Sequence, residues 1–260
     1  MIDNNFIKEH TLLECLQEYN GAPDGDKDSR QKALEKEFVL LAKKLLYGGF
    51  FLVKDKSGND VYKIEIQTVE FYYHEETISD NGIYDPIVYH RNGRYPSNPD
   101  LPVPAFPIMA LHTHQSGIDI TFEEKDGKYR ASALIRAFTV FDFRIKEYVK
   151  WDEAKENTDG IYHHRKEKPY IDERSQFLYY YINGFDINSG KSLTEWIPNK
   201  DVDYDSCPIY FGRRKNAYED KEKKILDKRK WAFSSYVVSF THSNSEKEKF
   251  DKYASRISIL

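Results

Sequence analysis

The sequence predicts an α+β fold, a mostly antiparallel, curved sheet with flanking helices in a single domain. Two observations lead to this expectation. Residues 5–48 carry apolar side chains at helical spacing, and the chain then changes to runs of β-branched and aromatic residues with a two-residue period. No Pro-, Gly- or Ser-rich linker divides the 260 residues, and a chain of this length can bury one sizeable core.

Two helices are expected at the start of the chain. The first covers residues 5–19, and the second is capped by Ser29 and ends at Gly48. The second helix has a single apolar stripe, so it has to pack against another element. We therefore divide the chain into an N-terminal helical extension, residues 1–29, and an α+β domain, residues 30–260.

Strands are expected to follow these helices. The runs GFFLVKD and IEIQTVEFYY form a hairpin through a turn at SGND. Residues 80–107 hold six of the ten prolines and form a long irregular loop, and loops of this length are more often functional than not. Further strands are expected over residues 108–123, 129–143, 207–212 and 231–241, and a helix over residues 172–185.

Composition limits the classes of protein to consider. The chain has two cysteines, no run of apolar residues long enough to cross a bilayer and no secretory leader, so we expect a cytoplasmic protein without disulfides. The net charge of −4 argues mildly against a nucleic-acid partner. The segment from Arg213 to Lys230, however, contains nine Lys or Arg and four acidic residues, an excess of 9 − 4 = +5. This segment is either a solvated helix or a patch that faces phosphates.

One carboxylate stands where a strand should present an apolar residue. Side chains two apart on a strand share a face, so Glu70 continues the row that Ile64 and Ile66 begin. Arg136 likewise shares a face with apolar neighbours in a later strand and needs an acidic partner or a water-filled cleft. Three interpretations of Glu70 stay open: half of a buried ion pair with Arg136, a solvent-exposed side chain, or a general base with Tyr72 beside it to stack on a planar ligand.

Three stretches in order resemble one enzyme family. They are LAKKLLYGGFFLVKDKSGNDVYKIEIQTVEFYY, DPIVYHRNGR and ASALIRAF, with a weaker echo in PIYFGRRKN and RKWAFSSYVV. Together they resemble the alkyladenine (3-methyladenine) DNA glycosylase family over about residues 38–140. The likeness lies in the order and spacing of the motifs, since no single motif is specific.

The resemblance implies a DNA glycosylase-like hydrolase of base excision repair. Such an enzyme flips an alkylated or deaminated purine out of the DNA and cleaves its N-glycosidic bond. Glu70 falls at the place of the water-activating Glu and Arg136 at that of the Arg beside the catalytic water. Tyr72 and His90 fall where side chains contact the base, and either His114 or His112 stands in for a second stacking Tyr. The resemblance implies that the enzyme needs no metal or cofactor. It also implies that the partner is damaged DNA, duplex or single-stranded, and that the protein is a monomer.

The chain departs from the family where an intercalating aromatic residue should stand. There it reads HTHQSGIDITF, with Ser116-Gly117 at the place of a Tyr-Gly pair. A substrate other than alkylated adenine and a loss of duplex binding both stay open. Two other functions also stay open: a cupin-like metal site made of His112, His114 and Asp119, and a non-catalytic nucleic-acid or sugar-binding module that uses the 20 Tyr and 16 Phe for stacking.

Overall fold

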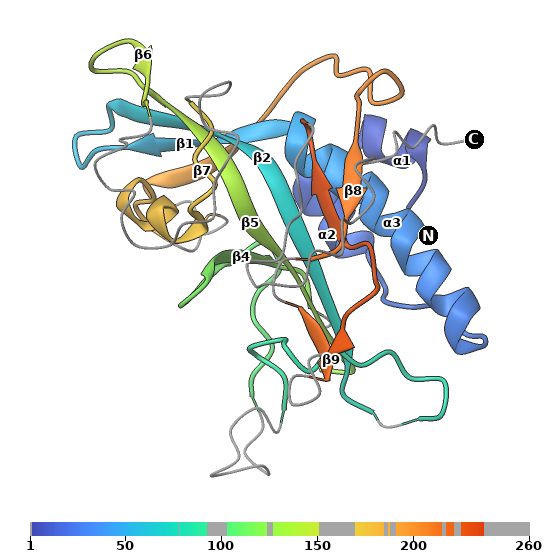
Figure 1. Ribbon diagram of the computed structural model, residues 1–260. Coiled ribbons are helices and arrows are strands. Elements are labelled where there is room, and N and C mark those ends of the chain that lie inside the picture. The colour runs from blue at the N-terminus through green and yellow to red at the C-terminus, as the bar shows by residue number, and fades with distance from the viewer. Residues whose placement is uncertain are drawn as a thin grey trace.

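The chain folds into helices and a mostly antiparallel, open sheet, as the sequence predicts (Figure 1). The computed structural model describes residues 2–77, 79–92, 103–123, 127–150, 170–184, 187, 191–214, 217–220 and 225–236. The helices are α1 (Asn4–Glu9), α2 (Leu12–Glu18), α3 (Lys27–Tyr47) and the 3-10 helix η2 (Ser175–Tyr180). The strands are β1 (Gly49–Lys54), β2 (Asp60–Glu75), β3 (Leu111–His114), β4 (Gly117–Thr121), β5 (Tyr129–Asp142), β6 (Glu147–Tyr148), β7 (Thr194–Pro198), β8 (Tyr210–Gly212), β9 (Tyr218–Asp220), β10 (Ile225–Leu226) and β11 (Ala232–Ser234).

Two long strands, β2 and β5, form the centre of the nine-stranded sheet. The main order is β3-β4-β5-β2-β1-β7, and β11 joins β2 to β8 on one side. The predicted β1–β2 hairpin is confirmed, with Phe51 opposite Ile64. A separate two-stranded ladder joins β9 and β10. Strands that lie far apart in the sequence therefore meet along β2.

The start of the chain differs from the prediction in two details. The single helix expected over residues 5–19 is two helices, because Thr11 and Glu14 form a capping box that starts α2. The cap of α3 is Asp26, whose carboxylate accepts hydrogen bonds from Ser29, and Ser29 is therefore not the cap. Both signals were present in the sequence.

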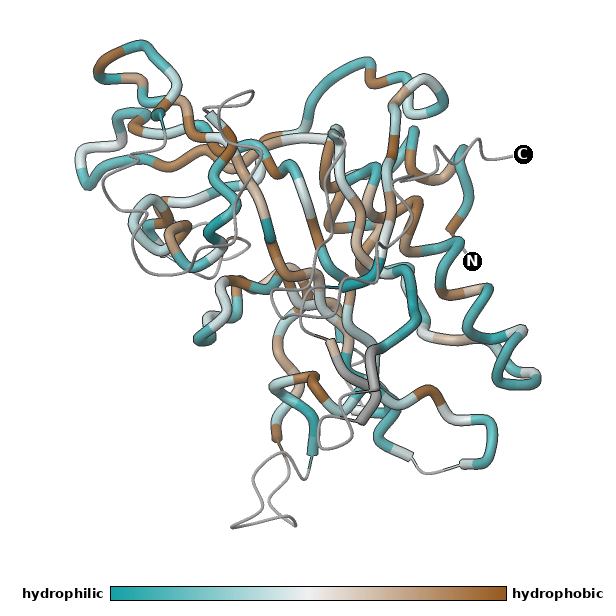
Figure 2. The backbone as a smooth tube through the Cα atoms, in the orientation of Figure 1, coloured by the Kyte–Doolittle hydropathy of each residue, from teal (hydrophilic) through white to brown (hydrophobic). Residues whose placement is uncertain are grey.

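The hydrophobic core lies between α3 and one face of the sheet. Phe38 of α3 stacks on Phe71 of β2 with ring centroids 4.6 Å apart. Buried residues of α1 and α2, such as Ile7 and Leu16, belong to the same core. Figure 2 shows hydrophobic residues along α3 and the central strands and hydrophilic residues in most connecting loops. Within the described ranges every helix is too short or too polar to span a lipid bilayer.

The opposite face of the sheet carries the polar residues of interest. Glu70 and Tyr72 alternate with Phe71, so they point away from α3. On the adjacent strand the matching face turns toward η2, because Arg136 bonds Ser175 at 3.3 Å. The pairing of β2 with β5 is irregular beside Gln67 and Thr68, where Arg136 has no partner in register. Such a bulge re-aims the side chain that it carries.

Later elements follow the predictions only partly. Residues 172–185 contain the short η2 in place of a longer helix, and residues 108–123 form the tight β3–β4 hairpin in place of one strand. Gly117, with φ at 140°, allows its sharp turn. The segment 213–230 contains β9 and β10, so its interpretation as a solvated helix is wrong. The end of the strand expected over residues 231–241 lies outside the described residues, as do parts of the loop 80–107 and of the basic segment.

Candidate functional site

Glu70 lies in the middle of the sheet with its carboxylate almost wholly buried. Its Cα is paired with Leu134 of β5 on one side and Ala232 of β11 on the other. The residue is 2 % exposed. Oε2 accepts a hydrogen bond of 2.9 Å from the Tyr72 hydroxyl, and Oε1 lies 3.6 Å from Arg136 Nε. The predicted ion pair is therefore present, and both carboxylate oxygens have partners.

The two partners of Glu70 are partly exposed. Burial, and then the charge of Glu70, raise the pKa of Tyr72 well above its usual value, so the hydroxyl stays protonated and donates. The Arg136 side chain is 17 % exposed and also bonds the Ser175 hydroxyl. Any water that Glu70 activates has to approach past these two side chains, because the carboxylate itself has almost no exposed surface.

His114 is fixed by contacts on two strands. Its Nδ1 accepts from the backbone N–H of Ser116 at 3.2 Å, and its Nε2 lies 3.0 Å from Asp119 Oδ1. The Ser132 hydroxyl donates to the other oxygen of Asp119 at 3.1 Å, and Tyr89 stacks on the His114 ring at 4.4 Å. Both ring nitrogens and one ring face of His114 are thus engaged. A planar ligand could contact only its remaining face.

His90 belongs to a neighbouring buried cluster. Its Nε2 pairs with the Glu123 carboxylate, which Arg130 also contacts at 3.0 Å, and Arg130 continues to Glu76 at 2.7 Å. His90 is 2 % exposed, and among the described residues its Nδ1 has no hydrogen-bond partner. An unpaired ring nitrogen at this depth costs free energy unless a ligand or a water bonds it.

Rings connect the cluster of His90 to that of His114. The His112 ring lies 5.6 Å from His90, 6.0 Å from His114 and 4.2 Å from Phe106, between ring centroids. Burial lowers the pKa of the half-buried His112, which favours the neutral imidazole. In the β3–β4 hairpin His112 is paired with Asp119, and Asp119 is paired with Leu134 of β5. Leu134 is in turn paired with Glu70, so one row of side chains across the sheet runs from His112 to Glu70. The rings thus lie on the face that carries Glu70.

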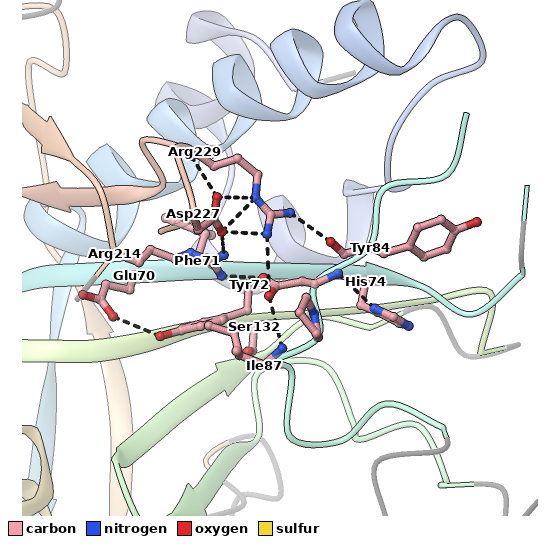
Figure 3. A network of polar contacts seen from close by, with 12 residues as sticks. Glu70, Phe71, Tyr72, His74, Tyr84, Ile87, Ser132, Arg214, Asp227 and Arg229 are labelled. Carbon is pink, nitrogen blue, oxygen red and sulfur yellow. Dashed lines mark hydrogen bonds and ion pairs between the residues drawn. The ribbon is translucent and has the colours of Figure 1, made fainter. Parts of the chain in front are cut away.

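A buried cluster of ion pairs lies against the ring of Tyr72 (Figure 3). Arg214, 1 % exposed, pairs with Asp85 and Asp227 and donates to the Phe71 carbonyl at 3.2 Å. Its guanidinium carbon lies 4.6 Å from the centroid of the Tyr72 ring. Arg229 bonds the same Asp227 at 2.6 Å, so the cluster contains two positive and two negative charges. One face of Tyr72 is therefore covered by Arg214.

The structure brings together three of the five predicted site residues. Glu70, Tyr72 and Arg136 are in contact, whereas His114 and His90 lie in adjoining clusters on the same side of the sheet. The sequence patterns did not single out Arg214, Glu123 or Asp85, which hold the polar residues of these clusters in place. Glu123 stands just past the end of β4 and Asp85 in an irregular segment, where periodicity gives no signal.

One cavity among the described residues lies away from this site. It has a volume of about 630 Å³ and is lined by residues such as Arg30, Tyr73, Glu75 and Lys128. Tyr73 and Glu75 alternate with Glu70 and Tyr72 along β2, so this cavity opens on the opposite face. It includes none of the predicted site residues.

Neither a search for metal ligands among the described residues nor comparison with known proteins points to a function. In the described parts of the chain no group of three or more His, Cys, Asp or Glu side chains is placed to hold a metal ion. His112, His114 and Asp119 lie close together, but Asp119 is engaged with His114 and Ser132. Comparisons of the chain with protein-family models, with curated proteins and with solved structures find no match. The function is therefore inferred from the residues of the site.

Proposed function

We propose that the protein is a DNA glycosylase-like hydrolase that cleaves the N-glycosidic bond of alkylated or deaminated purines. The observation that carries this proposal is the Glu70 carboxylate, buried on the face away from α3, bonded to Tyr72 at 2.9 Å and paired with Arg136 at 3.6 Å. A buried carboxylate costs free energy that an apolar pair would not, so its presence in the centre of a sheet favours a chemical role.

Each of the three residues takes part in the proposed reaction. Glu70 takes a proton from a water molecule while the water oxygen forms a bond to the anomeric carbon of the sugar. The C–N bond breaks, and its electron pair leaves with the base. Arg136 pairs with Glu70 beside the path of the water, and Tyr72 offers one ring face to the base and a hydroxyl to the carboxylate.

Recognition of the base falls to the rings beside Tyr72. His90 offers an unpaired Nδ1, and His114 offers one ring face. The β3–β4 turn carries Ser116 and Gly117 and is bonded to η2 through Tyr179, whose hydroxyl donates to Gly117 O at 2.8 Å. The proposal therefore assigns no intercalating residue to this turn. It includes the expectation of a cytoplasmic monomer that acts in DNA repair on damaged DNA, duplex or single-stranded.

The test is base release by Glu70→Gln with a matched control. Gln keeps the shape of the side chain and its acceptor for Tyr72 but cannot take the proton. Glu65→Gln is the control, because Glu65 lies on the same strand, pairs with Lys63 at 2.7 Å and is more exposed. We expect Glu70→Gln to abolish release of hypoxanthine or 3-methyladenine and to keep binding to DNA with an abasic-site analogue, whereas Glu65→Gln retains both. Loss of binding with normal turnover would contradict the proposal.

A second candidate is a non-catalytic binding module on the same fold. One observation favours it: both oxygens of Glu70 already have partners, and the residue is 2 % exposed. In that case the rings of Tyr72, His112 and His114 bind a base or sugar, and Glu70 only supports Tyr72. DNA binding by the wild type without base release, unchanged in Glu70→Gln, would favour this function.

A further inference from the structure

Arg214 contacts the Glu70 site although it lies 143 positions after Phe71 in the chain. Its guanidinium lies 4.6 Å from the Tyr72 ring centroid, and Tyr72 in turn bonds Glu70 at 2.9 Å. Among the described residues no aromatic ring stacks on Tyr72, so Arg214 is the planar group that covers it. A guanidinium packed on one face of a phenol ring limits how far the ring can turn, and so it holds the Tyr72 oxygen within reach of Glu70.

The guanidinium itself is held by three separate segments. It donates to the Phe71 carbonyl in β2, pairs with Asp85 in the segment that leads to His90, and pairs with Asp227 just after β10. Burial alone would disfavour its charge, but the charges of Asp85 and Asp227 hold the pKa of Arg214 above its usual value. A guanidinium with this many fixed contacts cannot change its direction without breaking a buried ion pair.

We propose that Arg214 is the positioning residue of the Glu70 site. By stacking on Tyr72 it fixes the phenol so that the hydroxyl donates to Glu70 and only the opposite ring face is left for a planar base. Through Asp85 it also ties the segment that carries His90 to the same point. This inference rests on the proposed function, since it assigns to Arg214 a role in the site that Glu70 and Tyr72 form.

Arg229 provides a matched control. It belongs to the same cluster, bonds the same Asp227 at 2.6 Å and stacks on Trp231 at 4.3 Å, on a ring that is not part of the site. Arg214→Lys and Arg229→Lys thus make the same chemical change in the same cluster. Lysine keeps the charge and loses the planar fork. Only the Arg214 variant frees the ring of Tyr72.

The test is a pair of double-mutant cycles with Tyr72→Phe, which removes only the hydroxyl. In the wild type and in Arg229→Lys, Tyr72→Phe should lower the folding equilibrium constant about fivefold, the value of one buried hydrogen bond. In Arg214→Lys the same substitution should lower it less than twofold, because the hydroxyl no longer points at Glu70. The same pattern is expected in the turnover number for base release.

The outcomes separate this inference from the proposed function. If the wild type releases no base, the proposed function fails, while the folding cycles still test Arg214. An equal effect of Tyr72→Phe in all three backgrounds would overturn the positioning role. If Arg214→Lys does not fold, Asp85→Asn replaces it, since it removes one carboxylate that holds the guanidinium and keeps Arg214 itself. Unchanged coupling in that background would equally overturn the role.

Discussion

The ion pair between Glu70 and Arg136 should be energetically asymmetric. Arg136→Met leaves a carboxylate that is 2 % exposed without its guanidinium. Removing one partner of a fully buried pair costs about 3 to 5 kcal/mol. The N–O distance here is 3.6 Å and the arginine side chain is 17 % exposed, so we expect a loss below that range, about 2 to 3 kcal/mol.

Glu70→Gln should cost much less. Glutamine keeps an oxygen that can accept from the Tyr72 hydroxyl, and the guanidinium that it leaves behind is partly solvated. We expect a loss of about 1 kcal/mol or less in the free energy of unfolding. If Glu70 serves catalysis and not the fold, the protein should lose little stability when the carboxylate is replaced by a neutral amide.

Urea unfolding of both variants at pH 7 measures this difference. The free energies are comparable only if the variants share one slope against urea. Arg136→Met should be less stable than Glu70→Gln by at least about 1 kcal/mol. A Glu70→Gln variant as unstable as Arg136→Met would show that the acid is needed for the fold, and would refute the reasoning.

Three further predictions concern the frame around the site. Burial alone would raise the pKa of Asp227, but hydrogen bonds from Arg229 and the nearby guanidinium charges hold it well below its usual range. Its charge therefore stabilises the fold above the unfolded pKa of about 3.9, and the stability difference between wild type and Asp227→Asn should shrink as pH falls from about 5 to 2. Urea unfolding at each pH checks this, and a difference that does not depend on pH would contradict it. Phe38→Ala removes a fully buried ring that stacks on Phe71, and it should lower the free energy of unfolding in urea by about 3 to 5 kcal/mol. A loss below about 1 kcal/mol would contradict this prediction. Thr11→Ala removes the capping box of α2 and should lower the free energy of unfolding by about 1 kcal/mol, measured in a thermal melt. An unchanged stability would contradict this prediction.

Local patterns predicted the central part of the fold correctly. The two-residue period placed Glu70 and Tyr72 on one face of a strand and Arg136 on a face with apolar neighbours, and the structure pairs these side chains. A strand period needs only the pleat of the backbone, so a single sequence carries it. The irregular pairing beside Gln67 leaves Arg136 outside the strand register. It depends on two strands at once and so leaves no local signal.

The contacts that complete the site could not be predicted from local patterns. Arg214 meets Asp85 across 129 positions of the chain, and periodicity says nothing about such separations. The basic segment therefore predicts a surface feature, whereas the Arg214 side chain is fully buried and that of Arg229 is 11 % exposed. Chain topology brings these groups together, because β11 returns to pair with β2 beside Glu70.

Base release from damaged DNA tests the central claim most directly. Oligonucleotides that contain hypoxanthine or 3-methyladenine are incubated with the wild type, Glu70→Gln and Glu65→Gln, and the free base is quantified. We predict release by the wild type and by Glu65→Gln, and none by Glu70→Gln that is still folded by circular dichroism. Equal release by all three proteins would contradict the role of Glu70 as the general base.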